Sequence, residues 1–156
     1  MAIKKSNYTG GNGRLVLASP FVANVVTEEL VIHTFTEEVT AADILELAYL
    51  PPYCRILDAA VVAVGTGATT LNIGFMTGEV GSDDPARTSG DELFAAVAPT
   101  TETPIALIDI AAAGKVDTPR SIGVVPSATI AASPTTQLVL RLRYATGVNP
   151  TVVPAA

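Results

Sequence analysis

The sequence predicts an all-β protein: an antiparallel β-sandwich, jelly-roll-like, with seven to nine strands and one short helix. The residues from Leu138 to Tyr144 alternate with a period of two, as in a strand with one buried face. Hydrophobic residues make up 49% of the chain, yet there is no Trp and only four Phe and four Tyr. Small and β-branched side chains suit pleated surfaces. Eleven Pro and twelve Gly interrupt the chain often, as many short strands require.

The first half of the chain contains four predicted strands. Ile44–Leu50 alternates, with Glu46 on the side opposite Leu45. A helix over the same stretch is the alternative, because Thr40 and Asp43 resemble a capping box. We favour the strand, because the prolines at 51 and 52 then form a turn into the next strand. The four segments are Leu30–Thr36, Ile44–Leu50, Arg55–Val64 and Leu71–Met76.

Arg55–Val64 is the segment with the strongest core character. It is apolar on both faces apart from Asp58, which is typical of a central strand covered on both sides. The sequence GTGATT, residues 65–70, separates it from the next strand and predicts a hairpin connection.

The second half begins with a polar loop within residues 78–99, followed by the predicted short helix. Ser89 can cap this helix and Glu92 can complete a capping box, while Leu93, Phe94 and Val97 supply its buried side. Further strands are predicted before the closing strand. They lie at Ile105–Ile110, Ser121–Val125 and Thr129–Ala131.

The length of 156 residues suits one domain, and the composition divides it into an N-terminal arm, 1–28, and a single β-sandwich domain, 29–156. The arm combines basic residues, glycines and the apolar run LVLASPFVANVV. It is either an element that binds a neighbouring molecule or a frayed terminus followed by an edge strand. The residues of the arm predicted to make contacts are Lys4, Lys5, Tyr8, Arg14, Leu15, Leu17 and Phe21.

Charge and hydropathy argue against two classes of partner. The net charge is −6, whereas nucleic-acid binding needs clustered Lys and Arg; Arg141 and Arg143 are better explained as a solvated face of a strand. The two long uncharged stretches, 59–78 and 121–140, contain several Gly and Thr or two Pro, unlike a membrane-spanning helix. We therefore expect neither nucleic acid nor a membrane as partner. With no convincing signal peptide and one cysteine, we expect synthesis in a reducing cytoplasm.

Catalytic chemistry has little support in the sequence. Cys54 is the only cysteine and His33 the only histidine; no motif joins them, so we predict that Cys54 packs and is not catalytic. One His and one Cys do not make a typical zinc site. The loop with Glu79, Asp83 and Asp84 lacks the spacing of a calcium-binding loop. We predict no catalytic residues, no metal and no cofactor.

The stretch VTAADILELAYLPPYCRILDAAVVAVGTGATTLNIGF resembles a pattern in small virion proteins of tailed bacteriophages. In this pattern an acidic start leads into an apolar strand and a proline turn. The strands Ile56–Ala59 and Leu71–Phe75 follow, and the closing LVLRLRY also fits.

The resemblance implies a capsid decoration (cement) protein that binds the lattice of the major capsid protein on the capsid exterior and stabilises the phage head. It also implies a homotrimer and carries no catalytic residues. An alternative within the virion is a tail or fibre component that binds a host receptor. A β-sandwich hydrolase is a third and weaker alternative, because no catalytic motif supports it.

Overall fold

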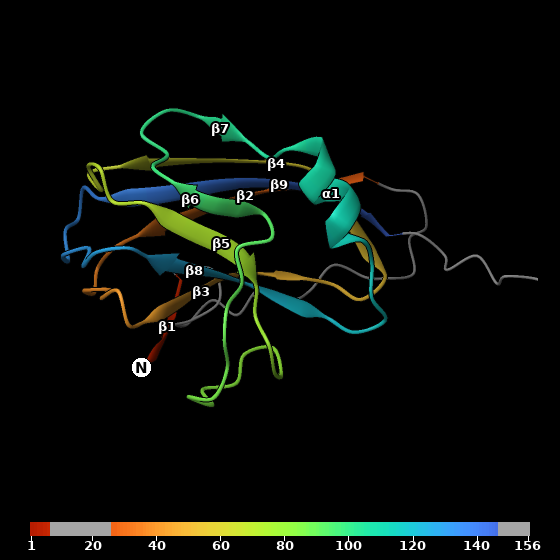
Figure 1. Cartoon of the computed structure of the whole chain (residues 1–156), viewed down its shortest axis with the longest axis horizontal. Coiled ribbons are helices and arrows are strands. Elements are labelled where there is room, and N and C mark those ends of the chain that lie inside the picture. Colours follow the sequence, from red (N-terminus) through yellow and green to blue (C-terminus); the bar gives the residue numbers. More distant parts are fainter. Residues whose placement is uncertain (7–25, 147–156) are drawn as a thin grey trace, which may run out of the picture.

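The computed structural model describes residues 1–6 and 26–146. It is a sandwich of two sheets (Figure 1), with nine strands and one short helix in the described residues. All strand pairs are antiparallel except β1 with β3, so the predicted antiparallel β-sandwich is confirmed. One sheet has the order β1-β3-β8-β5-β6 and the other β2-β9-β4-β7. The elements are β1 (Ile3–Lys5), β2 (Val26–Thr34), β3 (Ile44–Leu50), β4 (Cys54–Val64), β5 (Leu71–Phe75), β6 (Phe94–Val97), β7 (Thr103–Pro104), α1 (Leu107–Ala113), β8 (Arg120–Pro126) and β9 (Gln137–Thr146).

The core lies between the two sheets and is built from their inward-facing residues. Along the four-stranded sheet, Val31 of β2, Leu140 of β9 and Val61 of β4 are cross-strand neighbours, and all three are buried. The alternation predicted for 138–144 is confirmed, because Leu138, Leu140, Leu142 and Tyr144 all lie in this core. Burial of apolar side chains from two facing sheets is what holds a sandwich together.

The strand interpretation of residues 44–50 is confirmed. Thr40 and Asp43, which resemble a capping box, belong to a turn instead of a helix start. The Asp43 carboxylate accepts hydrogen bonds from the Thr40 backbone N–H at 3.0 Å and from the Thr40 hydroxyl at 2.8 Å. The same three-residue spacing therefore serves a tight turn before β3, because a short acidic side chain can bond the backbone just before it in either setting.

The predicted helix after Ser89 is wrong. Residues from Phe94 form β6 instead, and the Glu92 carboxylate accepts a hydrogen bond from the Phe75 N–H at 3.0 Å. The segment lies against β5 because Gly74 leaves room for it: a Cβ on Gly74 would meet the Gly90 backbone at 2.4 Å. Pairing with an open sheet edge satisfies more backbone groups than a short isolated helix would.

The observed helix, α1, lies where residues 105–110 are predicted as a strand, so that prediction is also wrong. Only Ile105 joins the sheet region, through a hydrogen bond from its N–H to the Ala59 carbonyl at 2.9 Å. The alanine-rich residues that follow favour a helix, and Ile110 and Ala113 pack against the core. The predicted strand at 129–131 is reduced to a single bridge between Ile130 and Val39.

Candidate docking surface and buried polar cluster

The outward-facing side of the four-stranded sheet carries an apolar patch that nothing in the described residues covers. We call it the outer face and define it by Leu30 and Ile32 of β2, Val139 of β9, and Val62 and Val64 of β4. Leu30, Ile32 and Val64 are 59%, 49% and 61% exposed, respectively. Large side chains exposed to this degree on neighbouring strands are typical of an interaction surface.

The strand register shows that the outer face is contiguous. Ile32, Val139 and Val62 are direct cross-strand neighbours and form one apolar row. In the row on one side of it, Val64 of β4 pairs with Gln137 of β9. In the row on the other side, Leu30 of β2 pairs with Arg141 of β9. These side chains stand together because residues two apart in a strand share a face.

Ion pairs border the outer face at one end. The Arg143 guanidinium lies 2.8 Å from the Glu28 carboxylate, and Arg141 lies 3.1 Å from Glu102 and 3.7 Å from Asp58. Arg143 is partly exposed and its charge is paired, in agreement with the solvated face predicted for these arginines. An apolar centre with a paired polar rim is the usual composition of a protein–protein contact.

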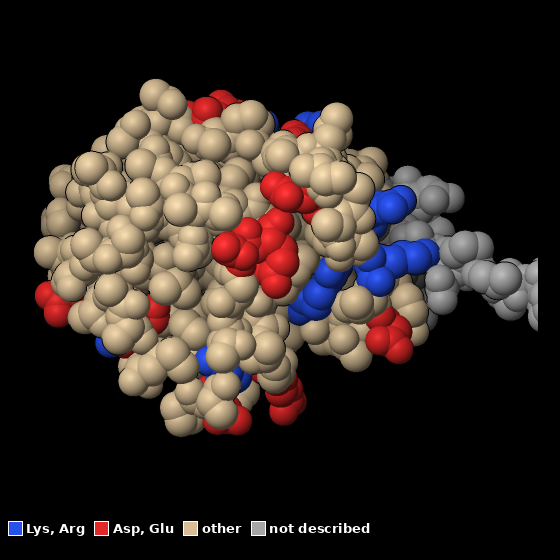
Figure 2. Space-filling view, viewed as in Figure 1, with Lys and Arg blue, Asp and Glu red and all other residues tan. Residues whose placement is uncertain are grey.

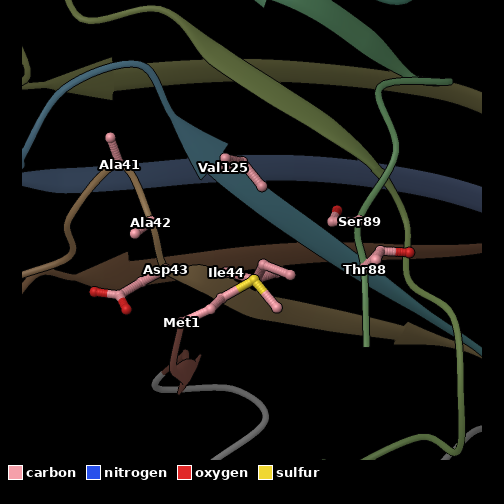
Figure 3. A pocket seen from close by; sticks show the side chains of 8 residues that line it. All are labelled: Met1, Ala41, Ala42, Asp43, Ile44, Thr88, Ser89 and Val125. Carbon is pink, nitrogen blue, oxygen red and sulfur yellow. The ribbon is translucent and has the colours of Figure 1, made fainter. Parts of the chain in front are cut away.

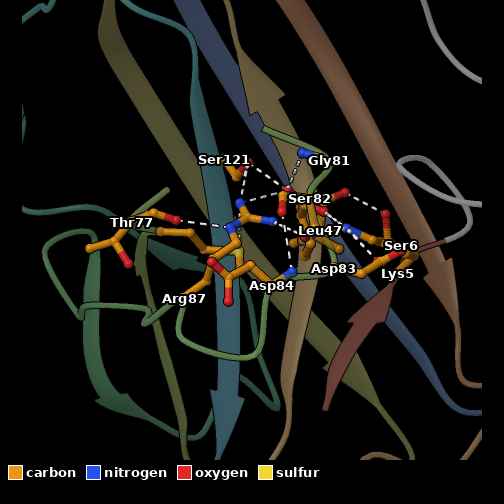
Figure 4. Close-up of polar contacts among 12 residues, drawn as sticks. Lys5, Ser6, Leu47, Thr77, Gly81, Ser82, Asp83, Asp84, Arg87 and Ser121 are labelled. Atoms are coloured by element: carbon orange, nitrogen blue, oxygen red, sulfur yellow. Dashed lines mark hydrogen bonds and ion pairs between the residues drawn. The ribbon is translucent and has the colours of Figure 1, made fainter. Parts of the chain in front are cut away.

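A second feature is a buried polar cluster beside the other sheet. We define it as Lys5, Glu46, Arg87 and Ser121, with the backbones of Gly81 and Ser82 (Figure 4). The side chain of Glu46 is fully buried and that of Arg87 is 1% exposed. Glu46 projects from β3, Ser121 from β8, Lys5 from β1, and Arg87 from the loop of residues 77–89.

The Glu46 carboxylate is the centre of the cluster. Its Oε1 accepts hydrogen bonds from Arg87 Nη2 at 2.9 Å, Ser121 Oγ at 2.5 Å and the Gly81 N–H at 3.1 Å, while Oε2 pairs with Lys5 Nζ. Burial raises the pKa of Glu46, but these hydrogen bonds together hold it below its ordinary value of 4.5. The charged form is therefore favoured inside the protein, because both oxygens of the carboxylate accept from donors.

The cluster attaches a loop that buries no apolar side chain and is otherwise closed by hydrogen bonds between Thr77 and Thr88 at its base. Residues 77–89 leave the sandwich and return to it, as the segment between β5 and β6 at the lower edge of Figure 1. Arg87 is the one buried side chain among them, and it also donates to the carbonyls of Thr77 at 2.8 Å and Ser82 at 2.6 Å. The acidic residues Asp83 and Asp84 of this loop are exposed.

The predicted arm residues fall in two groups. Lys4 and Lys5 lie in β1; Lys4 Nζ is 3.9 Å from the exposed Glu37 carboxylate, and Lys5 belongs to the polar cluster. The other predicted contact residues lie outside the described residues, namely Tyr8, Arg14, Leu15, Leu17 and Phe21. The described ends of the segment 1–28 are strands of the sandwich, so the arm prediction now concerns residues 7–25.

Cys54 lies at the start of β4 and is fully buried in the core. Burial raises the pKa of its thiol to about 11, so the thiolate that a nucleophile needs is scarce at neutral pH. We expect Cys54→Ala to keep the fold and to lower the free energy of unfolding by only about 1 kcal/mol, the scale of a small cavity. Urea denaturation measures this; a loss of several kcal/mol would show that the thiol does more than fill space.

His33 is 5% exposed, its ring packs edge-on against Phe35, and burial lowers its pKa from 6.5 to about 4. The unfolded chain therefore binds a proton that the folded chain does not between these two pH values. Stability should fall as the pH drops from 6.5 to 4, by up to about 3 kcal/mol. Urea denaturation across this range should show a shallower fall for His33→Leu. Equal slopes in the two proteins would contradict this assignment.

A shallow pocket of about 430 Å³ lies between the turn at residues 41–44 and Thr88–Ser89 (Figure 3). Its one charged lining group, Asp43, is already occupied by hydrogen bonds from Thr40 and from the Ala2 N–H at 3.1 Å. Within residues 1–6 and 26–146, no three His, Cys, Asp or Glu side chains come together as metal ligands.

Charged side chains are sparse on one face of the molecule. Figure 2 shows a face on which most of the surface is uncharged and on which Lys and Arg form only small groups beside acidic residues. None of the helices in the described part of the chain is long and apolar enough to cross a membrane.

The fold has close counterparts among solved structures. A chain in the structure of the capsid of Ralstonia phage GP4 superposes with a TM-score of 0.80 and 29% identity, over 95% of this chain and 100% of that one. This chain has the fold of a phage capsid component. The resemblance to phage virion proteins seen in the sequence is confirmed by this match.

Two further capsid structures share the fold at lower similarity. A chain from the acidic stable capsid of Helicobacter pylori bacteriophage KHP30 matches with a TM-score of 0.51 and 16% identity, over 80% of this chain and 90% of that chain. A chain from the capsid asymmetric unit of cyanophage Pam1 matches with a TM-score of 0.52 and 18% identity, over 87% and 97%. No protein-family model and no curated protein matches this sequence.

Proposed function

We propose that this phage capsid-like protein is a virion structural protein that decorates the capsid exterior and binds the lattice of the major capsid protein. The end-to-end match with a chain of the GP4 capsid carries the proposal, because it covers the whole of that chain at 29% identity. The one cysteine, Cys54, is buried, and burial raises the pKa of its thiol. These features support a structural role without catalysis.

The outer face is the proposed contact surface. In the described residues the sandwich core lies between the sheets, and Leu30, Ile32 and Val64 remain exposed outside it. Covering them against another protein would contribute free energy in proportion to the apolar area removed from water. A protein that binds only the assembled lattice stabilises that lattice by mass action, and many copies add their effects.

Two further elements of the proposal concern assembly. The homotrimer would place three outer faces on one lattice position, and symmetric association is common for soluble proteins. The segment 7–25 would make additional contacts across a capsid joint through Leu15, Leu17 and Phe21. A deletion of residues 1–20 would also remove β1 and Lys5, so Leu17→Ser with Phe21→Ser is the better variant for testing the segment alone.

The experiment mixes the purified protein with capsids of the phage that carries this gene, prepared without the protein. Sedimentation measures bound protein per capsid, and calorimetry measures the temperature at which the capsid shell opens. We expect saturable binding at a fixed copy number and a higher opening temperature. Failure to bind capsids would overturn the proposal, and binding to purified tails instead would favour the tail component considered from the sequence.

A further inference from the structure

We propose that Glu46 couples strand β1 to the loop of residues 77–89, so that docking of β1 and ordering of the loop are one cooperative step. The coupling is a property of the isolated chain and does not depend on capsid binding. It follows from how the two oxygens of one buried carboxylate are shared between two surface segments.

The two segments use different oxygens of the Glu46 side chain. Oε2 faces β1 and pairs with Lys5, whereas Oε1 faces the loop and accepts from Arg87 and the Gly81 N–H. A buried carboxylate that loses one of its cations is left with uncompensated charge. Departure of either segment therefore weakens the position of the other.

Lys5 also contacts the loop directly. Its Nζ lies 3.4 Å from the Ser82 carbonyl and 3.6 Å from the Asp83 carboxylate, in addition to its pair with Glu46. The Ser82 carbonyl at the same time accepts from Arg87 at 2.6 Å. One backbone carbonyl of the loop is thus held by a cation from β1 and by a cation from the loop itself.

Neither segment buries an apolar side chain of its own, although each has further backbone bonds. The Ile44 N–H donates to the Ala2 carbonyl at 3.1 Å beside β1, and the Thr77 N–H donates to the Thr88 carbonyl at 2.9 Å at the base of the loop. β1 has three residues at a sheet edge and pairs with β3 alone. Ser6, which follows β1, adds two hydrogen bonds to β3. Its N–H donates to the Glu46 carbonyl at 2.9 Å and its hydroxyl donates to the Leu47 carbonyl at 2.5 Å. The loop buries one side chain, Arg87. Segments with few buried apolar contacts open at low free energy, so a shared ion cluster can decide whether both are closed.

The coupling has a consequence for binding. β1 covers the edge of β3, and a ligand that displaces β1 from that edge would release residues 77–89 at the same time. Coupling between two sites is reciprocal, so a ligand that fixes the loop would also hold β1 in place.

Hydrogen exchange of the full-length chain, followed by mass spectrometry, tests the coupling. Lys5→Met keeps the aliphatic stem and removes the charge; we expect amides of residues 77–89 to exchange about tenfold faster or more, the range of ordinary coupling. Lys4→Met is the matched control, because Lys4 Nζ lies 3.9 Å from the exposed Glu37 carboxylate and outside the polar cluster, and it should leave the loop unchanged. Amides of β4 and β9 report that the sandwich itself stays folded.

The reciprocal variant acts from the loop. Arg87→Met should accelerate exchange in residues 2–6, although Arg87 lies 82 positions away from Lys5 in sequence. Unchanged loop exchange in Lys5→Met, with β1 exchange accelerated, would overturn the coupling, as would unchanged exchange of residues 2–6 in Arg87→Met.

A measurement on the unmodified protein covers the case in which a variant does not fold. Native-state exchange at increasing denaturant gives an opening free energy for each amide. The Ser6 and Gly81 amides, bonded to the carbonyl and the carboxylate of Glu46, should share one opening free energy and one denaturant dependence. Distinct values for the two amides would show independent opening and would exclude the coupling.

Discussion

Arg87→Met should lower the free energy of unfolding by about 3 kcal/mol or more, the largest effect that we expect from any single surface-loop residue of this protein. The guanidinium is fully buried and pairs with the buried Glu46 at 2.9 Å. Removing it leaves a carboxylate in the interior with part of its charge uncompensated, and it removes the donor to the Thr77 carbonyl and one of the two donors to the Ser82 carbonyl. Urea denaturation followed by circular dichroism measures the loss.

Arg143→Met is the matched control, because it removes the same charge from an exposed pair. Arg143 lies 2.8 Å from Glu28, but both side chains are nearly half exposed, so the loss should stay below about 1 kcal/mol. Combining Arg87→Met with Glu46→Leu should cost less than the sum of the two single changes, because the second removes the charge that the first left unpaired. Equal losses for Arg87→Met and Arg143→Met would contradict the role assigned to the cluster.

Ile32→Glu should reduce binding to the capsid lattice by about 100-fold, equivalent to about 2.7 kcal/mol, while leaving the fold intact. Ile32 lies at one end of the apolar row that continues through Val139 to Val62, and it is 49% exposed in the isolated chain. A carboxylate there costs little in water but would be buried without a partner in a complex. Titration of capsids with the variant, measured by sedimentation, gives the change in affinity.

Leu107→Glu distinguishes the outer face from the other prominent apolar surface. Leu107 begins α1 and is 82% exposed, with Ile108 beside it at 74%. If the outer face makes the contact, Leu107→Glu should bind capsids like the wild-type protein. Loss of binding in Leu107→Glu but not in Ile32→Glu would move the contact surface to α1 and refute the assignment made from the sheet.

The misplaced helix shows where local patterns stop being informative. Ser89 and Glu92 have the spacing of a capping box, yet Glu92 bonds the Phe75 N–H and the chain continues as β6. The deciding factor is the free edge of β5, which is not visible in the local sequence. The helix forms instead at Leu107–Ala113, where pairing with the sheet has ended after Ile105.

The sequence by itself determined the class of fold and most of the strands. Period-two alternation, as in Leu138–Tyr144, is a local property that any sheet with one buried face must satisfy, and it survives in β9. The apolar character around Cys54 likewise predicted a strand in the core. These features depend on residues close together in the chain, so they can be recognised without knowing the partners of each strand.

Only the tertiary structure decided that Glu46 is buried and that the side chains of the outer face are exposed. In the sequence Glu46 is the polar side of an alternating strand, yet it is fully buried, because Arg87 and Lys5, each 41 residues away, bring compensating charge. Leu30 and Ile32 look like core residues of a strand, yet they are exposed, because β2 presents Val31 to the core. Burial depends on which distant segments cover a residue, and that is fixed by packing rather than by local pattern.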